Sequence, residues 1–307
     1  MKRVLHHPRG EAIVMGIVWV IAVCVVFSPS TWISMMVRSF LPQWTVVFAV
    51  AGVWLARRRD PLPAWSLIGG ALLMASQLSG SSARVHAPID LRVAQFNVLQ
   101  TNRSHADVIA SIHASDADLV SVQEVDAAWA VALCKGLADR YPVRIIEPRS
   151  NCYGIALFSR VPLKDAHVLM LAASPAIEAT VGTARGDVRI FAVHASSPGS
   201  PGHFRARNRQ YELLAEHIVR MREMPTVVIG DLNAAPWDRD LLHFRACTGL
   251  RSNASLGAPT FPAVAHLALI PIDHVLTSAR ARVVHERTVH VPGSDHRGLV
   301  ADIAVGG

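Results

Sequence analysis

The sequence predicts an α/β domain that follows an apolar N-terminal region. Between about residues 90 and 305, short runs of apolar and β-branched residues alternate with amphipathic segments. This alternation is typical of an α/β domain whose sheets are covered on both faces. Before residue 81, by contrast, three long stretches carry no charged residue. The 307 residues therefore suffice for one domain of about 200 residues and a separate apolar region.

Each uncharged stretch approaches the length that crosses a bilayer. The stretches cover residues 12–27, 39–56 and 61–80, and a membrane-spanning helix needs roughly 17–25 residues. We expect residues 1–80 to form a membrane anchor with about three transmembrane helices, at about 12–35, 39–56 and 62–79, and residues 81–89 to form a linker. Two spans, or a signal peptide at the first stretch, are the alternatives. Two further apolar stretches follow the first, which argues against a cleaved signal peptide.

The placement of Lys and Arg predicts the orientation of this anchor. Lys2, Arg3 and Arg9 precede the first stretch, and residues 57–59 supply three arginines between the second and third, whereas only Arg38 separates the first two. Cytoplasmic loops carry the excess of Lys and Arg. We therefore expect an integral membrane protein with a cytoplasmic N-terminus. After three spans, the domain that follows would be periplasmic or extracellular.

The net charge of +7 comes mainly from the anchor. Residues 1–89 hold 8 basic and 2 acidic residues, a net charge of +6, and the remainder holds 22 basic and 21 acidic residues, a net charge of +1. The domain itself is therefore not a uniformly basic nucleic-acid-binding module. The four cysteines show no zinc-binding spacing. In an exported domain, Cys134 and Cys152 are the pair to test for a disulfide.

The domain reads as strands and helices in succession. Strands are expected at 91–98, 118–125, 154–160, 167–172, 176–182, 188–195, 226–230, 272–278, 282–288 and 299–305, and helices at 104–115, 126–140 and about 204–222. The four strands between 154 and 195 follow one another closely, which favours antiparallel pairing. Residues 238–270 show no clear pattern.

Polar side chains stand at the ends of six of these segments. They are Asn97, Glu124, His194, Asp231 with Asn233, Asp273, and Asp295 with His296. One polar strand end alone is as easily a turn, since Asp and Asn both form turns. Six such ends predict one site, because ligand sites of α/β sheets gather at strand ends. Carboxylate and amide oxygens without cysteine suit a hard divalent cation such as Mg²⁺ or Mn²⁺.

At these residues the sequence resembles the endonuclease/exonuclease/phosphatase superfamily, which has the DNase I-like fold. The matching motifs are QFNV, QEVD, GIALFSR, FAVHASSP, GDLNAAPWD, IDHV and SDHRGLV, in the family's order. The resemblance implies that residues 90–307 form a four-layer α/β sandwich, with two packed mixed β-sheets flanked by helices. It also implies metal-dependent hydrolysis of a phosphate ester.

The resemblance assigns three metal-side residues. Glu124 is similar to the principal metal-ligating glutamate of the family, Asn97 to the asparagine beside it, and Asp295 to a second metal-side carboxylate. One position departs from the family pattern, because several DNA-repair members carry an acid where this chain has Leu99. This departure weakens the interpretation as an apurinic-site nuclease.

The resemblance also assigns five catalytic residues. Asp231 is similar to the aspartate that orients or deprotonates the attacking water, and Asn233 to its amide partner at the phosphate. His296 resembles the histidine that contacts the scissile phosphate, with Asp273 holding its imidazole. His194 resembles a second histidine used at the phosphate or leaving group, although no glutamate partner for it is evident. His274, adjacent to Asp273, would point the opposite way on a strand and is expected to be structural.

Tyr153, Arg205 and Arg209 are candidate substrate contacts. The alternative for the two arginines, and for Arg207 between them, is a solvated helix start.

The leading function is a membrane-anchored phosphodiesterase, most simply a nuclease. Its expected partners are a phosphodiester substrate (nucleic acid or phospholipid) and the lipid bilayer. No protein partner is inferred. A sphingomyelinase-type phospholipid phosphodiesterase and a catalytically inactive, membrane-tethered binding module are the alternatives.

Overall fold

The computed structural model describes residues 8–57, 61–78, 87–252, 258–263 and 269–306. The chain forms two compact units, one of residues 1–80 with Trp237–Arg239 and one of residues 81–236 with 240–307. Most of the linker expected at 81–89 lies outside the described residues, as do Lys2, Arg3 and two of the three arginines at 57–59.

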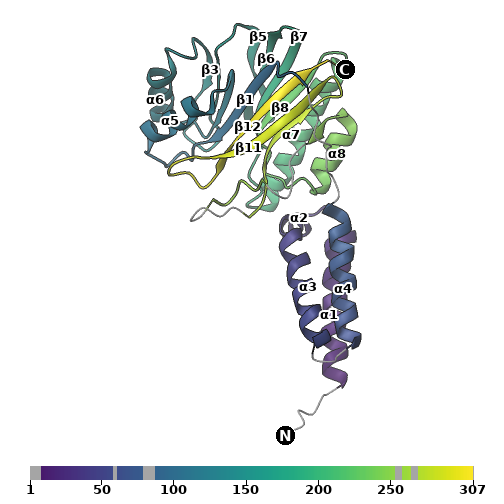
Figure 1. Ribbon diagram of the computed structural model, residues 1–307. Coiled ribbons are helices and arrows are strands. Elements are labelled where there is room, and N and C mark those ends of the chain that lie inside the picture. Colours follow the sequence, from purple (N-terminus) through teal and green to yellow (C-terminus); the bar gives the residue numbers. More distant parts are fainter. Residues whose placement is uncertain (1–7, 58–60, 79–86, 253–257, 264–268, 307) are drawn as a thin grey trace. The chain divides into compact units, whose positions relative to one another are not determined.

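The first unit is helical. Its helices are α1 (Pro8–Phe27), α2 (Trp32–Ser39), α3 (Leu41–Arg57) and α4 (Pro61–Ala75), followed by the 3₁₀ turn η1 (Ser76–Leu78) (Figure 1). Helix α4 packs against both α1 and α3. Within the described residues, the spans expected at 39–56 and 62–79 thus correspond to α3 and to α4 with η1.

The stretch at 12–35 is not one helix. It divides between Phe27 and Trp32, because Pro29 cannot continue a helix and the Thr31 side chain caps the start of α2 by accepting from Ser34 N–H at 3.2 Å. Segments Met15–Phe27 and Trp32–Ser39 bend by 103° at this break. Within the described part of the chain, no helix taken singly has both the length and the apolar composition to cross a membrane, and only this bent pair meets the criterion.

The second unit contains two six-stranded mixed sheets. The first has the order β11 (Ala281–His290), β12 (Arg297–Val305), β1 (Leu91–Asn97), β2 (Leu119–Gln123), β4 (Ile155–Ser159), β3 (Val143–Glu147). The second has the order β5 (Leu163–Leu171), β6 (Ser174–Thr183), β7 (Gly186–His194), β8 (Thr226–Asp231), β10 (Asp273–Thr277), β9 (Arg251–Ser252). In each sheet a central pair is parallel, β1 with β2 and β7 with β8, and the other pairs are antiparallel.

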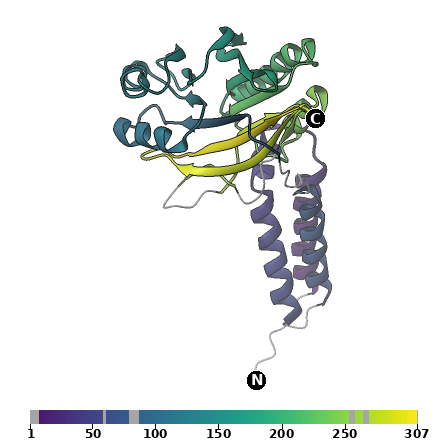
Figure 2. The ribbon, with the colours of Figure 1, turned by 45° about the horizontal axis from the view of Figure 1, so that its top comes forward.

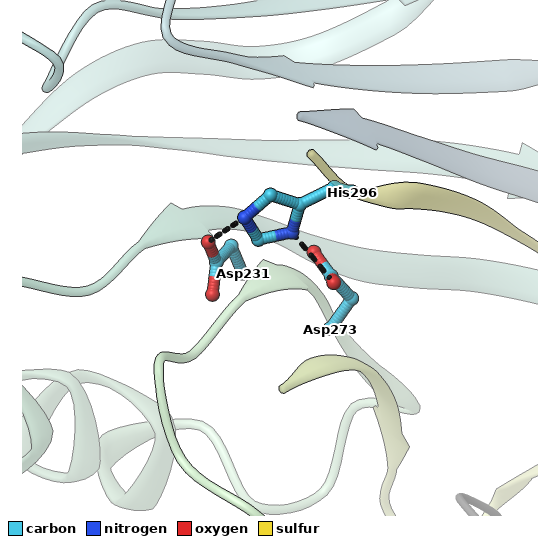
Figure 3. A group of neighbouring side chains, drawn as sticks. All are labelled: Asp231, Asp273 and His296. Atoms are coloured by element: carbon cyan, nitrogen blue, oxygen red, sulfur yellow. Dashed lines mark hydrogen bonds and ion pairs between the residues drawn. The ribbon is translucent and has the colours of Figure 1, made fainter. Parts of the chain in front are cut away.

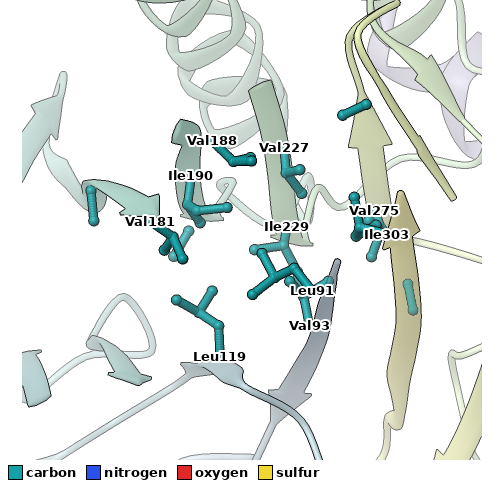
Figure 4. Close-up of a cluster of buried hydrophobic side chains, with 14 of the residues drawn as sticks. Leu91, Val93, Leu119, Val181, Val188, Ile190, Val227, Ile229, Val275 and Ile303 are labelled. Carbon is teal, nitrogen blue, oxygen red and sulfur yellow. The ribbon is translucent and has the colours of Figure 1, made fainter. Parts of the chain in front are cut away.

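The two sheets pack face to face over an apolar core. Alternate residues of their strands meet there, among them Val93, Leu119, Ile190, Ile229 and Ile303, all fully buried (Figure 4). Helices α5 (His105–Ser115) and α6 (Ala127–Leu137) cover the outer face of the first sheet, and α7 (Pro201–Arg220) and α8 (Arg239–Thr248) cover that of the second. Figures 1 and 2 show these two pairs of helices on opposite sides of the strands. The predicted arrangement of two mixed sheets flanked by helices is confirmed.

One detail of the predicted strand pairing was wrong. The strand at 154–160 does not pair with the strand at 167–172, because β4 joins β2 and β3 in the first sheet while β5 begins the second. Close spacing along the chain cannot distinguish a hairpin from a crossing between sheets. Strands β3 and β9 and helix α8 were not predicted.

Glu286 provides a pH-dependent test of this packing. It pairs with Ala301 of β12, so its side chain shares the face that packs into the core between the sheets, and its Oε2 atom is buried without a hydrogen-bond partner among the described residues. Burial raises the pKa of the Glu286 carboxyl from 4.5 to about 7. Between these values the unfolded chain loses a proton that the folded chain keeps. We therefore expect the free energy of unfolding to fall as the pH rises through this range, by up to about 3 kcal/mol.

The variant Glu286→Gln should remove this dependence. In urea unfolding it should match the wild type near pH 4.5 and be more stable than the wild type at pH 8. Glu216→Gln, which changes an exposed glutamate on α7, is the control and should follow the wild type at both pH values. Equal pH dependence of the wild type and Glu286→Gln would contradict this description of the core.

Candidate active site

The two central parallel pairs bring four predicted residues together. Asn97 and His194 end β1 and β7, Asp231 ends β8, and Glu124 follows β2 directly. The Asn97 amide Nδ2 donates to Glu124 Oε1 at 3.1 Å and to Asp231 Oδ2 at 3.2 Å. Asn97 thus joins the end of the first sheet to the end of the second.

The backbone turns sharply at these strand ends. Leu99, Glu124 and Asn233 all have a left-handed conformation, with φ values of 58°, 65° and 49°. Such conformations are costly for residues other than glycine and tend to occur at functional sites. Before Asp231, Gly230 has φ of 146°, and a Cβ atom there would lie 1.8 Å from the Val193 carbonyl oxygen. Only glycine therefore fits where β7 and β8 converge on the site.

Asp231, Asp273 and His296 form a buried group within the site (Figure 3). His296 Nδ1 lies 2.9 Å from Asp273 Oδ2, and His296 Nε2 lies 3.7 Å from Asp231 Oδ2. Burial opposes protonation of the imidazole, but the Asp273 and Asp231 carboxylates outweigh it and raise the pKa of His296 to about 10. Burial, reinforced by Asp273, also raises the pKa of Asp231 above its ordinary value. His296 is therefore a cation at neutral pH.

His194, unlike His296, has a lowered pKa. Its Nε2 atom lies 3.7 Å from Asp231 Oδ2, and burial lowers the pKa of its imidazole so that it is neutral at pH 7. Its Nδ1 atom has no hydrogen-bond partner among the described residues. The Tyr153 ring lies 5.8 Å from the His194 ring, and Tyr153 Oη lies 2.8 Å from Ser196 Oγ. Tyr153 is thus at the site, beside the neutral histidine.

The oxygen atoms of Glu124 and Asp295 fit a hard divalent cation. Asp295 Oδ1 is buried and has no hydrogen-bond partner among the described residues. Burial raises the pKa of Asp295, and the nearby charge of Glu124 raises it further. A cation would satisfy the unpaired oxygen and relieve this repulsion. Asn97 Oδ1 accepts from Leu99 N–H at 3.1 Å, which fixes the amide beside Glu124.

A second group could hold a metal by distance alone. One ligand atom from each of Asp231, Asp273 and His296 lies within 4.8 Å of the others. However, Asp273 already accepts from Gln95 Nε2 at 2.7 Å on one oxygen and faces His296 Nδ1 on the other. Both oxygens of Asp273 are therefore already engaged by other residues of the site, which favours a proton-sharing role for this group.

Three consecutive backbone carbonyls hold the segment after β8 in place. The Leu232 carbonyl accepts from Tyr211 Oη, the Asn233 carbonyl from Arg207 Nη1 at 3.0 Å, and the Ala234 carbonyl from His274 Nε2 at 2.7 Å. We call Tyr211, Arg207 and His274 the carbonyl clamp. All three side chains are almost fully buried. Asn233 is fixed further, because its N–H donates to Asp231 Oδ1 at 2.8 Å and its Nδ2 donates to the Ala195 carbonyl at 2.9 Å.

The clamp changes the interpretation of the arginines on α7. Arg205 and Arg209 are exposed, and Arg209 pairs with Glu212 at 2.8 Å on the surface. The structure does not bring either of them to the cluster. Arg207 is the arginine that contacts the site segment, and it also faces Asp240 at 3.1 Å.

The sequence did not single out four further residues. Gln95 Nε2 donates to Gln123 Oε1 at 2.8 Å as well as to Asp273, so two strand glutamines continue the polar network into the core. Ser294 Oγ donates to the Asn97 carbonyl at 2.8 Å and accepts from His296 N–H at 3.0 Å. The Phe261 ring lies 4.8 Å from the His296 ring.

Cys134 and Cys152, expected as a possible disulfide, are both free thiols.

Comparison with known proteins agrees with this arrangement. The family model described as the Endonuclease/Exonuclease/phosphatase family matches residues 94–296, about two thirds of the chain. The chain belongs to this family. The predicted resemblance is thereby confirmed, and the chain is an enzyme of the phosphodiesterase or phosphatase class. The family is generally dependent on divalent metals.

Solved structures share the fold at low sequence identity. An endonuclease/exonuclease/phosphatase from Beutenbergia cavernae is 22% identical with a TM-score of 0.59, and the match covers 72% of each chain. The human Nocturnin catalytic domain with bound sulfate anion is 21% identical with a TM-score of 0.57, covering 72% of this chain and 96% of that one. D. rerio TDP2 complexed with single strand DNA product is 15% identical with a TM-score of 0.57, covering 70% and 99%. No curated protein matches the chain.

The variant Tyr211→Phe tests the carbonyl clamp. It keeps the ring that stacks on Phe244 but leaves the buried Leu232 carbonyl without its donor, at a cost of about 1–3 kcal/mol in stability. Because Leu232 follows Asp231, we expect kcat for a phosphodiester substrate to fall by about tenfold through misplacement of the carboxylate, with little change in KM.

Tyr141→Phe is the matched control. Tyr141 is also buried and donates to a backbone carbonyl, that of Ala117 at 3.0 Å, in the apolar layer beneath α5 and α6. It should lose similar stability and keep its kcat. Equal losses of kcat in the two variants would mean that Tyr211 acts only through stability.

Proposed function

We propose that this protein is a divalent-metal-dependent phosphodiesterase that hydrolyses nucleic acid strands. The observation that supports it most is the position of His296, whose Nδ1 lies 2.9 Å from Asp273 Oδ2 and whose Nε2 lies 3.7 Å from Asp231 Oδ2. Both carboxylates favour the protonated imidazole, and Glu124 and Asp295 add oxygen ligands that suit a divalent cation. A phosphodiester is an anion that repels nucleophiles. Positive charge on one side and a carboxylate base on the other suit its hydrolysis.

The chain's own residues divide the work of the reaction. Asp231, whose Oδ2 lies 3.7 Å from Nε2 of both His194 and His296, accepts a proton from water while the water oxygen forms its bond to phosphorus. His296 donates a charge-assisted hydrogen bond to a phosphate oxygen. The P–O bond to the leaving group then breaks, and the leaving oxygen takes a proton from solvent. Glu124, Asn97 and Asp295 would hold Mg²⁺ or Mn²⁺, which when bound stabilises the negative charge that develops on the phosphate.

One structural relative supports the choice of nucleic acid as the substrate. One structural relative, TDP2, binds a single strand DNA product, and another, Nocturnin, binds a sulfate anion in its catalytic domain. The phospholipid alternative has no comparable support. A catalytically inactive binding module is disfavoured because the chain keeps Asp231, Asp273 and His296 and brings one ligand atom of each within 4.8 Å of the others.

Plasmid nicking by the full-length chain in detergent tests this proposal. With Mg²⁺ the wild type should convert supercoiled plasmid to open circles, and a chelator should abolish the reaction. Asp231→Asn, which keeps the size of the side chain but not its basicity, should lower the rate at least about a hundredfold. Asp187→Asn, which changes a half-exposed aspartate paired with Lys164, is the control and should nick as the wild type does.

Failure of the wild type to nick plasmid, together with hydrolysis of sphingomyelin vesicles, would transfer the proposal to a lipid substrate. Binding of DNA without any turnover would support the inactive module.

We also propose that the N-terminal unit anchors the enzyme in a membrane with the catalytic domain outside the cytoplasm. The uncharged stretches and the arrangement of Lys and Arg around them support this topology. Cys247 is an exposed free thiol on α8 and can report on it. In intact cells, a membrane-impermeant maleimide should label the wild type more strongly than Cys247→Ser. Labelling that requires permeabilised cells would place the domain in the cytoplasm.

A further inference from the structure

An open groove lies beside Glu124, outside the cluster that performs the chemistry. It has a volume of about 630 Å³ and is lined by residues from the loop after β1, the start of α6 and the loop after β3. Gln100 connects the groove to the active site, because its N–H donates to Glu124 Oε2 at 3.0 Å. Its side-chain amide donates to the carbonyls of Arg149 and Asn151 at 3.2 and 3.0 Å. The groove therefore adjoins the active site at Gln100, next to Glu124.

Two arginines give this groove donors that the protein does not use. Arg103 donates through Nη1 to the Gln100 carbonyl at 2.9 Å and faces Asp126 at 3.6 Å. Arg149 pairs through Nη2 with Glu147 at 2.7 Å, and its side chain, 39% exposed, lines the groove. A guanidinium carries five N–H donors in a planar fork, which suits bidentate binding of phosphate. Each arginine thus keeps donors for an anion.

The neighbouring acids do not prevent Arg103 and Arg149 from binding an anion. Asp126 caps α6, since its Oδ1 accepts from Trp129 N–H at 2.8 Å, and the Glu147 side chain is 32% exposed. Partly exposed ion pairs are weak, so a phosphate can replace or share them. The helix end is already capped by Asp126, so the two guanidinium groups, rather than the helix, supply the binding.

We propose that Arg103 and Arg149 bind a phosphate next to the scissile one in a nucleic acid strand. This inference rests on the proposed function and names the substrate's second contact. A strand presents a phosphate at every nucleotide, whereas a sphingomyelin-type lipid has only the one that is cleaved and would leave the groove empty. Local arginines also explain how a domain with a net charge of only +1 holds a polyanion, because affinity depends on the phosphates contacted and not on net charge alone.

The double variant Arg103→Gln/Arg149→Gln of the full-length chain tests the groove with two substrates. One is a short single-stranded oligonucleotide, and the other is bis(p-nitrophenyl) phosphate, which has only the scissile phosphate. We expect kcat/KM for the oligonucleotide to fall by about tenfold and its log–log salt dependence to weaken by about 1.4, or 0.7 for each lost contact. Hydrolysis of bis(p-nitrophenyl) phosphate should not change.

The matched control is Arg144→Gln/Arg282→Gln. It removes the same charge from exposed positions on β3 and β11 and should leave both substrates unaffected. An equal loss in the control would mean that only bulk charge matters, and would overturn the inference.

Three other outcomes would also overturn it. The groove variant could lose both activities equally, keep its oligonucleotide activity, or lose hydrolysis of sphingomyelin vesicles. A wild type that hydrolyses bis(p-nitrophenyl) phosphate but no oligonucleotide would instead refute the proposed nuclease function, so the two failures are distinguishable.

Discussion

The hydrogen bonds that Asn97 makes between the two sheets are the contacts on which the site depends. From one buried amide, Asn97 reaches Glu124 in its own sheet and Asp231 in the other. A second crossing lies deeper, where Gln95 of β1 donates to Asp273 of β10. Buried polar groups must be paired to be tolerated. These hydrogen bonds between the sheets therefore fix how the two sheets are placed against each other at the edge where the strands end. A shift of one strand would separate Glu124 from Asp231.

The same burial sets the charges of the site. Two histidines lie at similar distances from Asp231, yet one is a cation and the other is neutral. Asp273 makes the difference, because it contacts His296 and leaves His194 without a carboxylate at its Nδ1. Membership of the endonuclease/exonuclease/phosphatase family is thus matched by a physical arrangement in which acid, base and metal donors occupy separate positions.

The sequence predicted the strand ends well because polar residues there interrupt apolar runs. The sequence prediction missed Gln95 and Gln123, which lie within strands. Both are two residues or fewer from a predicted site residue. The alternation of side chains along a strand places Gln95 on the same face as Asn97. It also chose Arg205 and Arg209 over Arg207. The buried residues Phe204, Arg207, Tyr211, Leu214 and Ile218 follow a three-four spacing along α7, so the helical period already marked Arg207 as inward-facing. Phe261 lies in a segment without periodicity, and no sequence signal placed its ring beside His296.

The position of a bound metal tests the central claim most directly. We would crystallise the full-length chain with Mn²⁺ and locate the ion by its anomalous scattering. We predict a peak coordinated by the carboxylates of Glu124 and Asp295, with the His296–Asp273 contact intact. A peak between Asp231, Asp273 and His296 would contradict it, because those residues would then be ligands and could not supply the base and the protonated imidazole.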